Sequence, residues 1–518
     1  MLFSIADCIA ANAVAFPARI AIEVLDPRRY PEPVRRFTYR GLWQAVCVLA
    51  DAFGYVEAGR HGPMVATLLP NGSGQLISYL AAQVAGVTAV PLDGRRGHDE
   101  LAYILRDCEA SVLVAAGPSL DAAHALAHEL GLRVLDLGRV DLGGEHLDYL
   151  PGSRDSGRTP AVVAYTAGTT GFPKGMFWSN QDWLLRLFRS GWAFGVSPDH
   201  TVSMSGPLLH VPFGGMALGA LIIGARVRII TDFELDVALQ EYARHCTWVC
   251  LTPAVLGAVT ERWHERGRPS LDAVRLLLTT GSAGPVPLLE AAFDLFPRAR
   301  ITEAYGWIEG GWICHEVKDR EALVPNSVGW PIVGAEISIR DDNGLTVADG
   351  GRGELVARTL VPFGGYLGEE QRSAELLTPD GFVRSGDVAT RLEDGRVAIV
   401  DRIADRISVN GRFVYCTEVE GVLRRHPDVV DVAVFGAQGP NGPCVAAAVV
   451  LRRDAAPSPP AALAVADELR RSCRSHLDAF QCPQVVIPLD SLPRSSAGQV
   501  LKYRLVQELS PPRPAPRR

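Results

Sequence analysis

The sequence has no excess of positive charge. Its 51 lysines and arginines are outnumbered by 58 aspartates and glutamates, which gives a formal net charge of −7. Proteins that bind nucleic acids usually carry a basic excess, because they must neutralise phosphates. The charge balance therefore argues against a nucleic-acid partner. It leaves room for a local basic patch around a small anionic ligand.

Cysteine pairs with a recognisable spacing are also absent. The ten cysteines occur singly, and the nearest two, Cys246 and Cys250, lack the two-residue spacing of a zinc knuckle or a redox motif. We therefore expect idle or buried thiols in a reducing compartment.

The sequence shows no mark of export or of a membrane span. The first residues lack a basic cluster and Asp7 follows early, so no signal peptide is predicted. The longest stretches free of formal charge, between Arg60 and Asp93 and between Asp199 and Arg226, are interrupted by prolines and glycines. We expect a cytoplasmic protein without a membrane partner.

Strand-like and helix-like segments alternate regularly through most of the chain. Residues 65–69 form an apolar strand-like run, residues 75–84 follow a helical pattern, and residues 87–92 are strand-like again. This order predicts an α/β fold with helix-flanked, largely parallel sheets. At 518 residues the chain exceeds what one hydrophobic core normally serves, so several domains are expected.

The pattern changes twice in the last third of the chain. After Gly329, short strand-like runs alternate with turns of aspartate, asparagine and glycine, which indicates small antiparallel structure. From Asp401 a mixed α+β pattern begins, and residues 511–518 are rich in proline and arginine. We expect an N-terminal domain at 1–401, a C-terminal domain at 402–510 and a disordered tail at 511–518.

The segment Tyr165–Gly175 has the composition of a phosphate-binding loop. Its glycines let the backbone approach an anion, its hydroxyls donate hydrogen bonds, and its lysine adds positive charge. Pro173 stands where a Walker A loop requires glycine, so that class is excluded. The residues expected at the phosphates are Thr166, Gly168, Thr169, Thr170 and Lys174.

The complete string resembles the phosphate-binding signature of the adenylate-forming (ANL) superfamily, which includes acyl-CoA synthetases, peptide-synthetase adenylation domains and beetle luciferases. The resemblance continues in order from Phe37 to Leu505. It implies an acyl-CoA ligase that holds a carboxylic acid as acyl-AMP and passes the acyl group to a thiol. The implied fold is a large N-terminal domain of two helix-flanked β-sheets plus a distorted β-barrel, with a small mobile α+β lid.

The same resemblance assigns residues to the nucleotide. In Ala304–Glu309, Tyr305 would stack on adenine and Glu309 would ligate Mg²⁺, for which a carboxylate is a suitable hard donor. Asp387 would accept hydrogen bonds from both ribose hydroxyls, and Arg402, at the hinge, would add a further ribose contact. The implied cofactors are ATP or acyl-AMP, CoA and Mg²⁺.

It also assigns residues to the acyl group and the thiol. His210 matches the residue that gates the acyl and thiol channels, and Gly411 would line the tunnel for the pantetheine arm, where a glycine leaves space. Trp307 is the best candidate for the acyl pocket, because it lies inside the adenine motif, and a bulky acid is expected. The opposite wall would consist of Gly281, Ser282, Ala283 and Gly284.

Near its end the sequence departs from the family. The family lysine that bridges the carboxylate and the α-phosphate during adenylation is replaced by Gln499, directly after Gly498. Glutamine brings no charge to an anionic transition state, and losing one such group costs about 3 kcal/mol, or roughly a hundred- to a thousandfold in rate. Lys502 lies three residues on: on a strand it faces away, and on a helix it could swing back.

Two further departures weaken adenylation in the same sense. Ile308 replaces a threonine that usually contacts the phosphate, and Ala404 stands where the hinge usually carries aspartate or lysine. We therefore hypothesise a non-adenylating ligase that takes preformed acyl-AMP from a separate adenylating partner. It resembles the small set of such ligases in natural-product pathways, including platensimycin-type diterpenoid biosynthesis.

Four alternatives share the same motifs. The first is a complete two-step ATP-dependent acyl-CoA synthetase, and the second is a standalone adenylation domain that loads a separate carrier protein. A luciferase-like oxygenase is the third, and it would differ in consuming oxygen. The fourth is a non-catalytic scaffold, against which the presence of Glu309 and Asp387 counts. Fold analogy alone does not choose among them.

Overall fold

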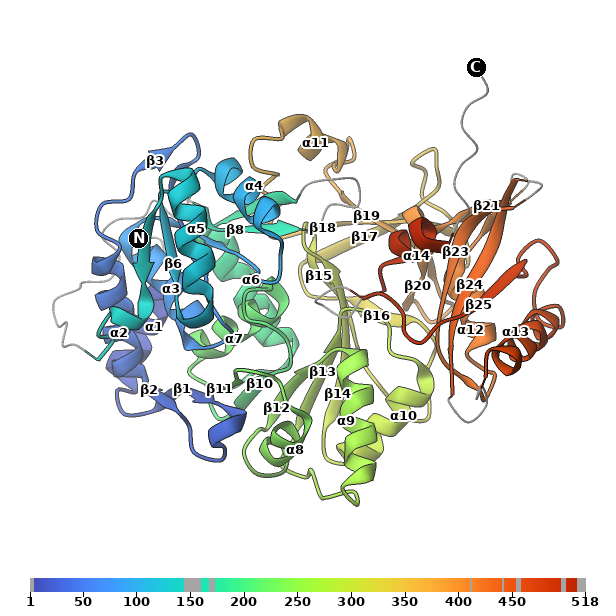
Figure 1. Ribbon diagram of the computed structural model, residues 1–518, viewed down its shortest axis with the longest axis horizontal. Coiled ribbons are helices and arrows are strands. Elements are labelled where there is room, and N and C mark those ends of the chain that lie inside the picture. Colours follow the sequence, from blue (N-terminus) through green and yellow to red (C-terminus); the bar gives the residue numbers. More distant parts are fainter. Residues whose placement is uncertain are drawn as a thin grey trace. The chain divides into compact units, whose positions relative to one another are not determined.

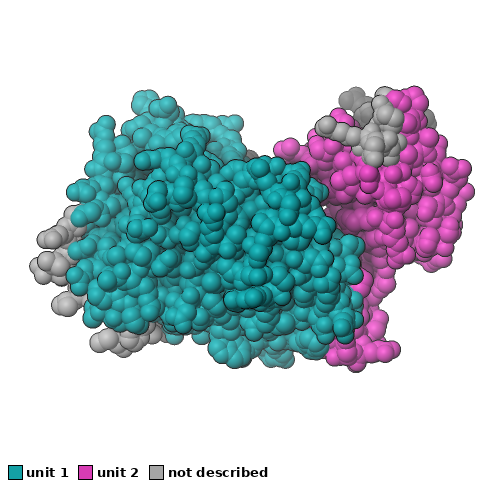
Figure 2. Space-filling model, turned by 90° about the horizontal axis from the view of Figure 1, so that it is seen from below, with its two compact units in different colours: residues 1–324, 330–337, 357–384 teal, residues 325–329, 338–356, 385–518 magenta. Residues whose placement is uncertain are grey.

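The computed structural model describes residues 4–143, 160–166, 173–409, 412–439, 442–452, 458–494 and 500–509. The chain forms two compact units, drawn in different colours in Figure 2. Unit 1 comprises residues 1–324, 330–337 and 357–384, and unit 2 comprises residues 325–329, 338–356 and 385–518. The domain boundary that the sequence predicts between residues 401 and 402 stays a prediction.

The first sheet of unit 1 is mainly parallel (Figure 1). Eight neighbouring strands of this 13-stranded sheet follow the order β15-β14-β13-β12-β10-β11-β1-β2, and all neighbours from β14 to β1 run parallel. In chain order the strands are β1 (Ile20–Leu25), β2 (Arg35–Thr38), β10 (Thr201–Met204), β11 (Arg226–Ile230), β12 (Trp248–Leu251), β13 (Leu276–Thr280), β14 (Arg300–Trp307) and β15 (Gly311–Val317). The helix-flanked parallel sheet that the sequence predicts is thus confirmed.

The second sheet has the order β7-β6-β4-β5-β8-β9, with β3 beside β4. In chain order its strands are β3 (Ala58–Gly59), β4 (Gly62–Leu68), β5 (Thr88–Pro91), β6 (Val112–Ala115), β7 (Arg133–Asp136), β8 (Pro160–Thr166) and β9 (Lys174–Ser179). β8 and β9 are antiparallel, and Thr166 lies opposite Lys174. The two ends of the phosphate-binding loop are therefore fixed on neighbouring strands.

Helices in unit 1 form three groups. The largest core cluster joins both sheets through α1 (Ile5–Ala15), α2 (Tyr39–Ala52), α3 (Ser73–Ala85), α6 (Asn180–Ala193) and α7 (Val211–Ile223). The second sheet packs on α4 (His98–Cys108) and α5 (Leu120–Leu130), and the first on α8 (Leu235–Arg244), α9 (Pro253–Glu265) and α10 (Val286–Leu295). Helix α7 carries no charged residue, as expected of a helix buried all round.

Two helix starts place residues that matter below. Helix α6 begins after Ser179, whose Oγ accepts a hydrogen bond from the N–H of Asp182 (3.1 Å). Helix α7 begins after His210 with Pro212 in its first turn, and it ends at Gly224 with a positive φ of 98°. The proline in the first turn of α7 therefore favours a helix start directly after His210.

Short antiparallel strands follow residue 324, as the turn-rich sequence predicts. They are β16 (Ser327–Pro331), β17 (Ala335–Arg340), β18 (Arg352–Thr359), β19 (Val383–Arg391) and β20 (Val397–Arg402). β20 pairs antiparallel with both β16 and β19. In the chain, the short helix α11 (Glu370–Glu375) lies between β18 and β19, and it belongs to unit 1.

The end of the chain has the expected mixed α+β structure. Its elements are β21 (Ile407–Val409), β22 (Arg412–Val414), α12 (Cys416–Leu423), β23 (Val429–Gly439), β24 (Gly442–Leu451), α13 (Pro459–Cys473), β25 (Val485–Pro488) and α14 (Lys502–Leu509). β23, β24 and β25 form one sheet. An α/β fold with a large N-terminal part of several sheets and a small C-terminal domain is thereby confirmed.

The sequence predicts unpaired cysteines and no membrane-spanning helix. All ten cysteines are free thiols and nine of them are buried. Within the described part of the chain, no helix has both the length and the apolar character that a bilayer span needs.

Candidate active site

The proposed acyl and adenine residues lie at the carboxyl ends of two neighbouring parallel strands. Thr280, the last residue of β13, is paired with Ala304, so Gly281 and Tyr305 follow at adjacent places on the sheet edge. Open α/β sheets bind ligands at this edge. Gly281 has a φ of +96°, a conformation that favours glycine. The two segments are therefore neighbours on the sheet of unit 1, and their roles at the acyl group and the adenine stay predictions.

A buried ionic group holds the Gly281–Gly284 segment. Glu303 Oε1 accepts a hydrogen bond from the backbone N–H of Gly284 (2.6 Å), and Glu303 Oε2 lies 2.8 Å from Lys318 Nζ. Lys318 Nζ also lies 2.7 Å from Glu316 Oε2. Burial raises the pKa of Glu303 and outweighs the opposing effect of Lys318. No sequence motif had pointed to this group.

Tyr305, Trp307 and Glu309 lie on one hairpin, formed by β14 and β15. A Cβ on Gly306 would lie 2.1 Å from the carbonyl oxygen of Gly311, so the close approach of the two strands requires glycine there. The rings of Tyr305 and Trp307 are 5.9 Å apart between centroids and tilted by 52°. The buried Trp307 Nε1 has no hydrogen-bond partner among the described residues. The role of Trp307 in the acyl pocket stays a prediction.

The carboxylate of Glu309 is held by a residue that sequence reasoning had missed. Tyr366 donates its hydroxyl hydrogen to Glu309 Oε1 (2.6 Å). Burial, and then the Glu309 charge, raise the pKa of Tyr366, so the phenol stays protonated. Arg186, on α6, donates to the backbone carbonyl of Glu309 (3.3 Å). Hydrogen bonds therefore hold both the side chain and the backbone of Glu309 in place.

The metal role expected of Glu309 stays a prediction, and a single carboxylate is compatible with it. Mg²⁺ is usually held by one or two carboxylates together with substrate phosphates and water, rather than by a full protein cage. The described ranges contain no group of three or more His, Cys, Asp or Glu arranged to hold a metal. Glu309 would hold the ion together with the phosphates of ATP.

Lys174, at the end of the phosphate-binding loop, is placed beside the same tyrosine. Its Nζ lies 5.2 Å from the centroid of the Tyr366 ring. Burial, with a contribution from Arg372, lowers the pKa of Lys174. Gly168, Thr169 and Thr170, and the side chain of Thr166, lie outside the described residues. Their expected phosphate contacts stay predictions.

His210 follows a loop that is held by hydrogen bonds with Asn71 and with Tyr79 on α3. The N–H of Leu208 donates to Asn71 Oδ1 (3.0 Å), and the Tyr79 hydroxyl donates to the Leu209 carbonyl (3.3 Å). Burial lowers the pKa of His210, although Asp93 opposes the shift. The imidazole is therefore neutral at pH 7.

The two predicted ribose residues come together in unit 2. Asp387 on β19 and Arg402 on β20 are register partners, and Arg402 Nε lies 3.3 Å from Asp387 Oδ1. Asp387 is buried, whereas Arg402 is exposed. The expected contacts of Asp387 and Arg402 with the ribose stay predictions.

Lys502, the nearest lysine to position 499, is already paired within unit 2. It is the first residue of α14, and its Nζ lies 2.9 Å from Glu420 Oε1 and 4.0 Å from Asp405 Oδ2. Burial opposes its charge, but these carboxylates raise the pKa of Lys502 above its ordinary value. Gly411 and Gln499 lie outside the described residues.

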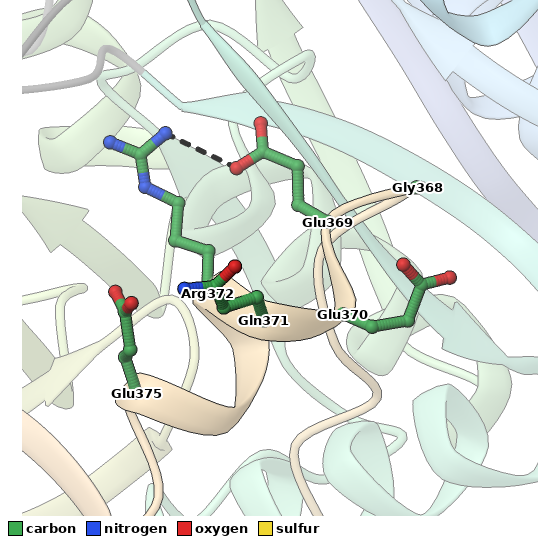
Figure 3. A pocket seen from close by; sticks show the side chains of 6 residues that line it. All are labelled: Gly368, Glu369, Glu370, Gln371, Arg372 and Glu375. Atoms are coloured by element: carbon green, nitrogen blue, oxygen red, sulfur yellow. Dashed lines mark hydrogen bonds and ion pairs between the residues drawn. The ribbon is translucent and has the colours of Figure 1, made fainter.

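A hollow of about 450 Å³ beside α11 does not suit a nucleotide (Figure 3). Its lining residues are Gly368, Glu369, Glu370, Gln371, Arg372 and Glu375. Three carboxylates against one guanidinium give this lining a net charge of −2, which repels phosphates. We do not assign it to ATP.

Comparison with known proteins places the chain in a family. Residues 9–367 match the family described as AMP-binding enzyme, and residues 418–499 match the AMP-binding enzyme C-terminal domain. The chain belongs to the AMP-binding enzyme family. Its class is that of the AMP-forming acid–thiol ligases, which join carboxylic acids to CoA with the use of ATP.

Several relatives match nearly the whole chain. A feruloyl-CoA synthase from Amycolatopsis sp is 31% identical over 472 residues, which cover 90% of this chain and 92% of that protein. A long-chain-fatty-acid–CoA ligase from Thermus thermophilus is 28% identical and covers 93% and 92%. Among solved structures, the amide bond synthetase McbA from Marinactinospora thermotolerans is 27% identical, with a TM-score of 0.83, and covers 97% and 99%.

Proposed function

We propose that this ligase transfers the acyl group of a bulky acyl-adenylate to CoA much faster than it forms that adenylate from ATP. The observation that carries the proposal is Gln499, which stands where the family has its adenylating lysine. The missing charge costs about 3 kcal/mol at the adenylating transition state, or roughly a hundred- to a thousandfold in rate. Thiol attack on acyl-AMP does not use that charge.

No other lysine is available to take its place. The whole chain contains three lysines, Lys174, Lys318 and Lys502. Lys174 closes the phosphate-binding loop, and Lys318 lies buried between Glu303 and Glu316. Lys502 is paired with Glu420 in its own unit. Each lysine thus already has a role or a partner.

The two half-reactions place different demands on the site. In adenylation a carboxylate oxygen of the acid attacks the α-phosphorus of ATP and pyrophosphate leaves. Lys174 and the loop N–H groups would neutralise the phosphates, and Mg²⁺ held at Glu309 would add to that neutralisation. In thioesterification the CoA sulfur attacks the acyl carbonyl carbon, the thiol proton passes to solvent, and AMP leaves. His210 is neutral and adds no charge to the thiol channel.

Two versions of this function remain distinct. In the first, the enzyme is a complete two-step synthetase with a slow first step. The named relatives favour this version, because they are described as synthases and ligases in their own right. In the second, a separate adenylating ligase supplies acyl-AMP and only thioesterification occurs here. Gln499 and Ile308 favour the second version.

The acid is proposed to be bulky and largely aromatic or apolar. Trp307 supplies a large ring with one donor that has no described partner. Ferulate, the acid named for the 31% identical relative, is therefore the first compound to test, followed by a long-chain fatty acid.

One assay separates the versions. Purified enzyme is given synthetic acyl-AMP with CoA, or the acid with ATP and CoA, for each acid. We expect turnover at least a hundredfold faster with acyl-AMP. A small but measurable release of pyrophosphate from acid and ATP selects the complete synthetase, and none selects the restricted enzyme. Equal turnover in both mixtures refutes the proposal.

A further inference from the structure

A strap formed by residues 363–368 lies alongside β9, the strand that follows the phosphate-binding loop. Tyr366 forms an antiparallel bridge with Met176 on β9, and the Leu367 N–H donates to the Gly175 carbonyl (2.7 Å). A Cβ on Gly364 would lie 2.6 Å from the Phe177 carbonyl oxygen, so glycine permits this close approach. The strap is therefore tied to the strand that begins with Lys174.

Tyr366 reaches from this strap to the residue expected to bind the metal. Its hydroxyl donates to Glu309 Oε1 at 2.6 Å, while Lys174 Nζ lies 5.2 Å from the centroid of its ring. Its backbone N–H donates to Ser373 Oγ (2.8 Å), and the residue is only 8% exposed. One rigidly held side chain thus contacts both the lysine of the phosphate loop and the glutamate of the adenine motif.

We propose that Tyr366 is a positioning residue that orients the Glu309 carboxylate for Mg²⁺. Through its ring, Tyr366 also couples the orientation of Glu309 to the position of Lys174. The proposal rests on the metal role given to Glu309 above. A ligand carboxylate gains affinity when a neighbour fixes its orientation, and loss of such a neighbour typically weakens metal binding roughly 10- to 100-fold. With Oε1 held by Tyr366, Oε2 is the oxygen left for the ion.

A purely structural role predicts something different. Tyr366 also belongs to the large core cluster of unit 1, so its removal could act through stability alone. The Tyr366→Phe variant keeps the ring, its packing and the contact with Lys174, and it removes only the hydroxyl. A structural role would lower the melting temperature and affect all ligands alike. A positioning role would affect the metal selectively.

A direct titration tests the proposal without relying on turnover. Mn²⁺ binding is measured by electron paramagnetic resonance in the presence of α,β-methylene-ATP. We expect Tyr366→Phe to weaken Mn²⁺ binding roughly 10- to 100-fold. Thioesterification of synthetic acyl-AMP in EDTA should stay within about twofold of wild type, because that step needs no metal.

Tyr39→Phe is the matched control. It deletes the hydroxyl of another buried tyrosine, which lies 2.9 Å and 2.7 Å from the carbonyl oxygens of Leu221 and Ala225. The control should leave Mn²⁺ binding unchanged, whatever it does to the melting temperature. Equal loss of Mn²⁺ affinity in both variants would overturn the proposal.

Glu309→Gln separates this inference from the function on which it rests. If Glu309→Gln weakens Mn²⁺ binding and adding Tyr366→Phe weakens it no further, the tyrosine acts through the glutamate. If Glu309→Gln weakens Mn²⁺ binding and Tyr366→Phe alone does not, the positioning role is refuted and the metal role of Glu309 stands. If Glu309→Gln has no effect, the metal role itself is wrong and the inference fails with it.

Discussion

Lys502 Nζ lies 2.9 Å from Glu420 Oε1, between helices α14 and α12 of the same unit. The pair is largely buried, with side-chain exposures of 18% and 8%. Burying a cation is costly unless it is paired, and breaking the pair leaves the buried Glu420 with the more exposed Arg424, 3.4 Å away. The lysine nearest to position 499 thus forms a buried ion pair within unit 2 and contributes to the stability of that unit.

The first prediction concerns that pair. Lys502→Met should lower the free energy of unfolding by up to about 3 kcal/mol, because the buried Glu420 keeps only the more exposed Arg424, 3.4 Å away, and a backbone N–H. Denaturant titration measures the loss. Arg470→Ala, which breaks an exposed pair with Asp467, serves as the control in unit 2 and should cost no more than about 1 kcal/mol.

The same variant tests whether Lys502 takes part in catalysis. A structural residue should leave the ratio of the two half-reactions unchanged in the folded enzyme. A selective fall in adenylation, with thioesterification intact, would show that Lys502 serves the missing function of position 499.

The second prediction is a pH dependence from His210. Because burial lowers the pKa of His210 in the folded state, the unfolded chain binds the proton first as the pH falls. The contribution of His210 to stability is full above its unfolded pKa of about 6.5 and is lost as the pH falls through the folded value.

His210→Asn should therefore reduce the loss of melting temperature between pH 7.5 and pH 5. Scanning calorimetry over this range measures the difference. His200 and His315 have pKa values lowered in the same sense, so the variant should flatten the profile without abolishing its slope. An unchanged profile would mean that His210 is not buried in its neutral form.

The third prediction concerns the nucleotide. Asp387→Ala should weaken binding of AMP at least tenfold, because hydrogen bonds to a charged acceptor contribute about 1.5–3 kcal/mol each. Isothermal titration with AMP measures the change. Arg402→Ala should weaken it less, since its exposed side chain makes a more solvated contact. The ribose assignment fails if Asp387→Ala binds AMP as wild type does.

Much of the site could be predicted because its residues are close in sequence and lie at strand ends. Tyr305, Trp307 and Glu309 share one hairpin, and the parallel order of β13 and β14 brings Gly281 beside them. The α/β fold followed from the alternation of apolar segments. These features depend on local patterns that a single sequence displays.

The residues that hold the site could not be predicted in this way. Tyr366 lies 57 positions from Glu309, and Arg186 lies 123 positions from it. Lys318 meets Glu303 only because β14 and β15 pair antiparallel. Such contacts come from tertiary packing, and nothing in the local sequence around either partner indicates the other.

The most direct test restores the missing charge. Gln499→Lys should raise the rate of pyrophosphate release from acid and ATP roughly a hundred- to a thousandfold, and leave the conversion of acyl-AMP and CoA within about twofold of wild type. That result would show that the absent cation at position 499 limits adenylation. If the variant accelerates neither reaction, or if wild type already forms acyl-AMP as fast as it consumes it, the account is contradicted.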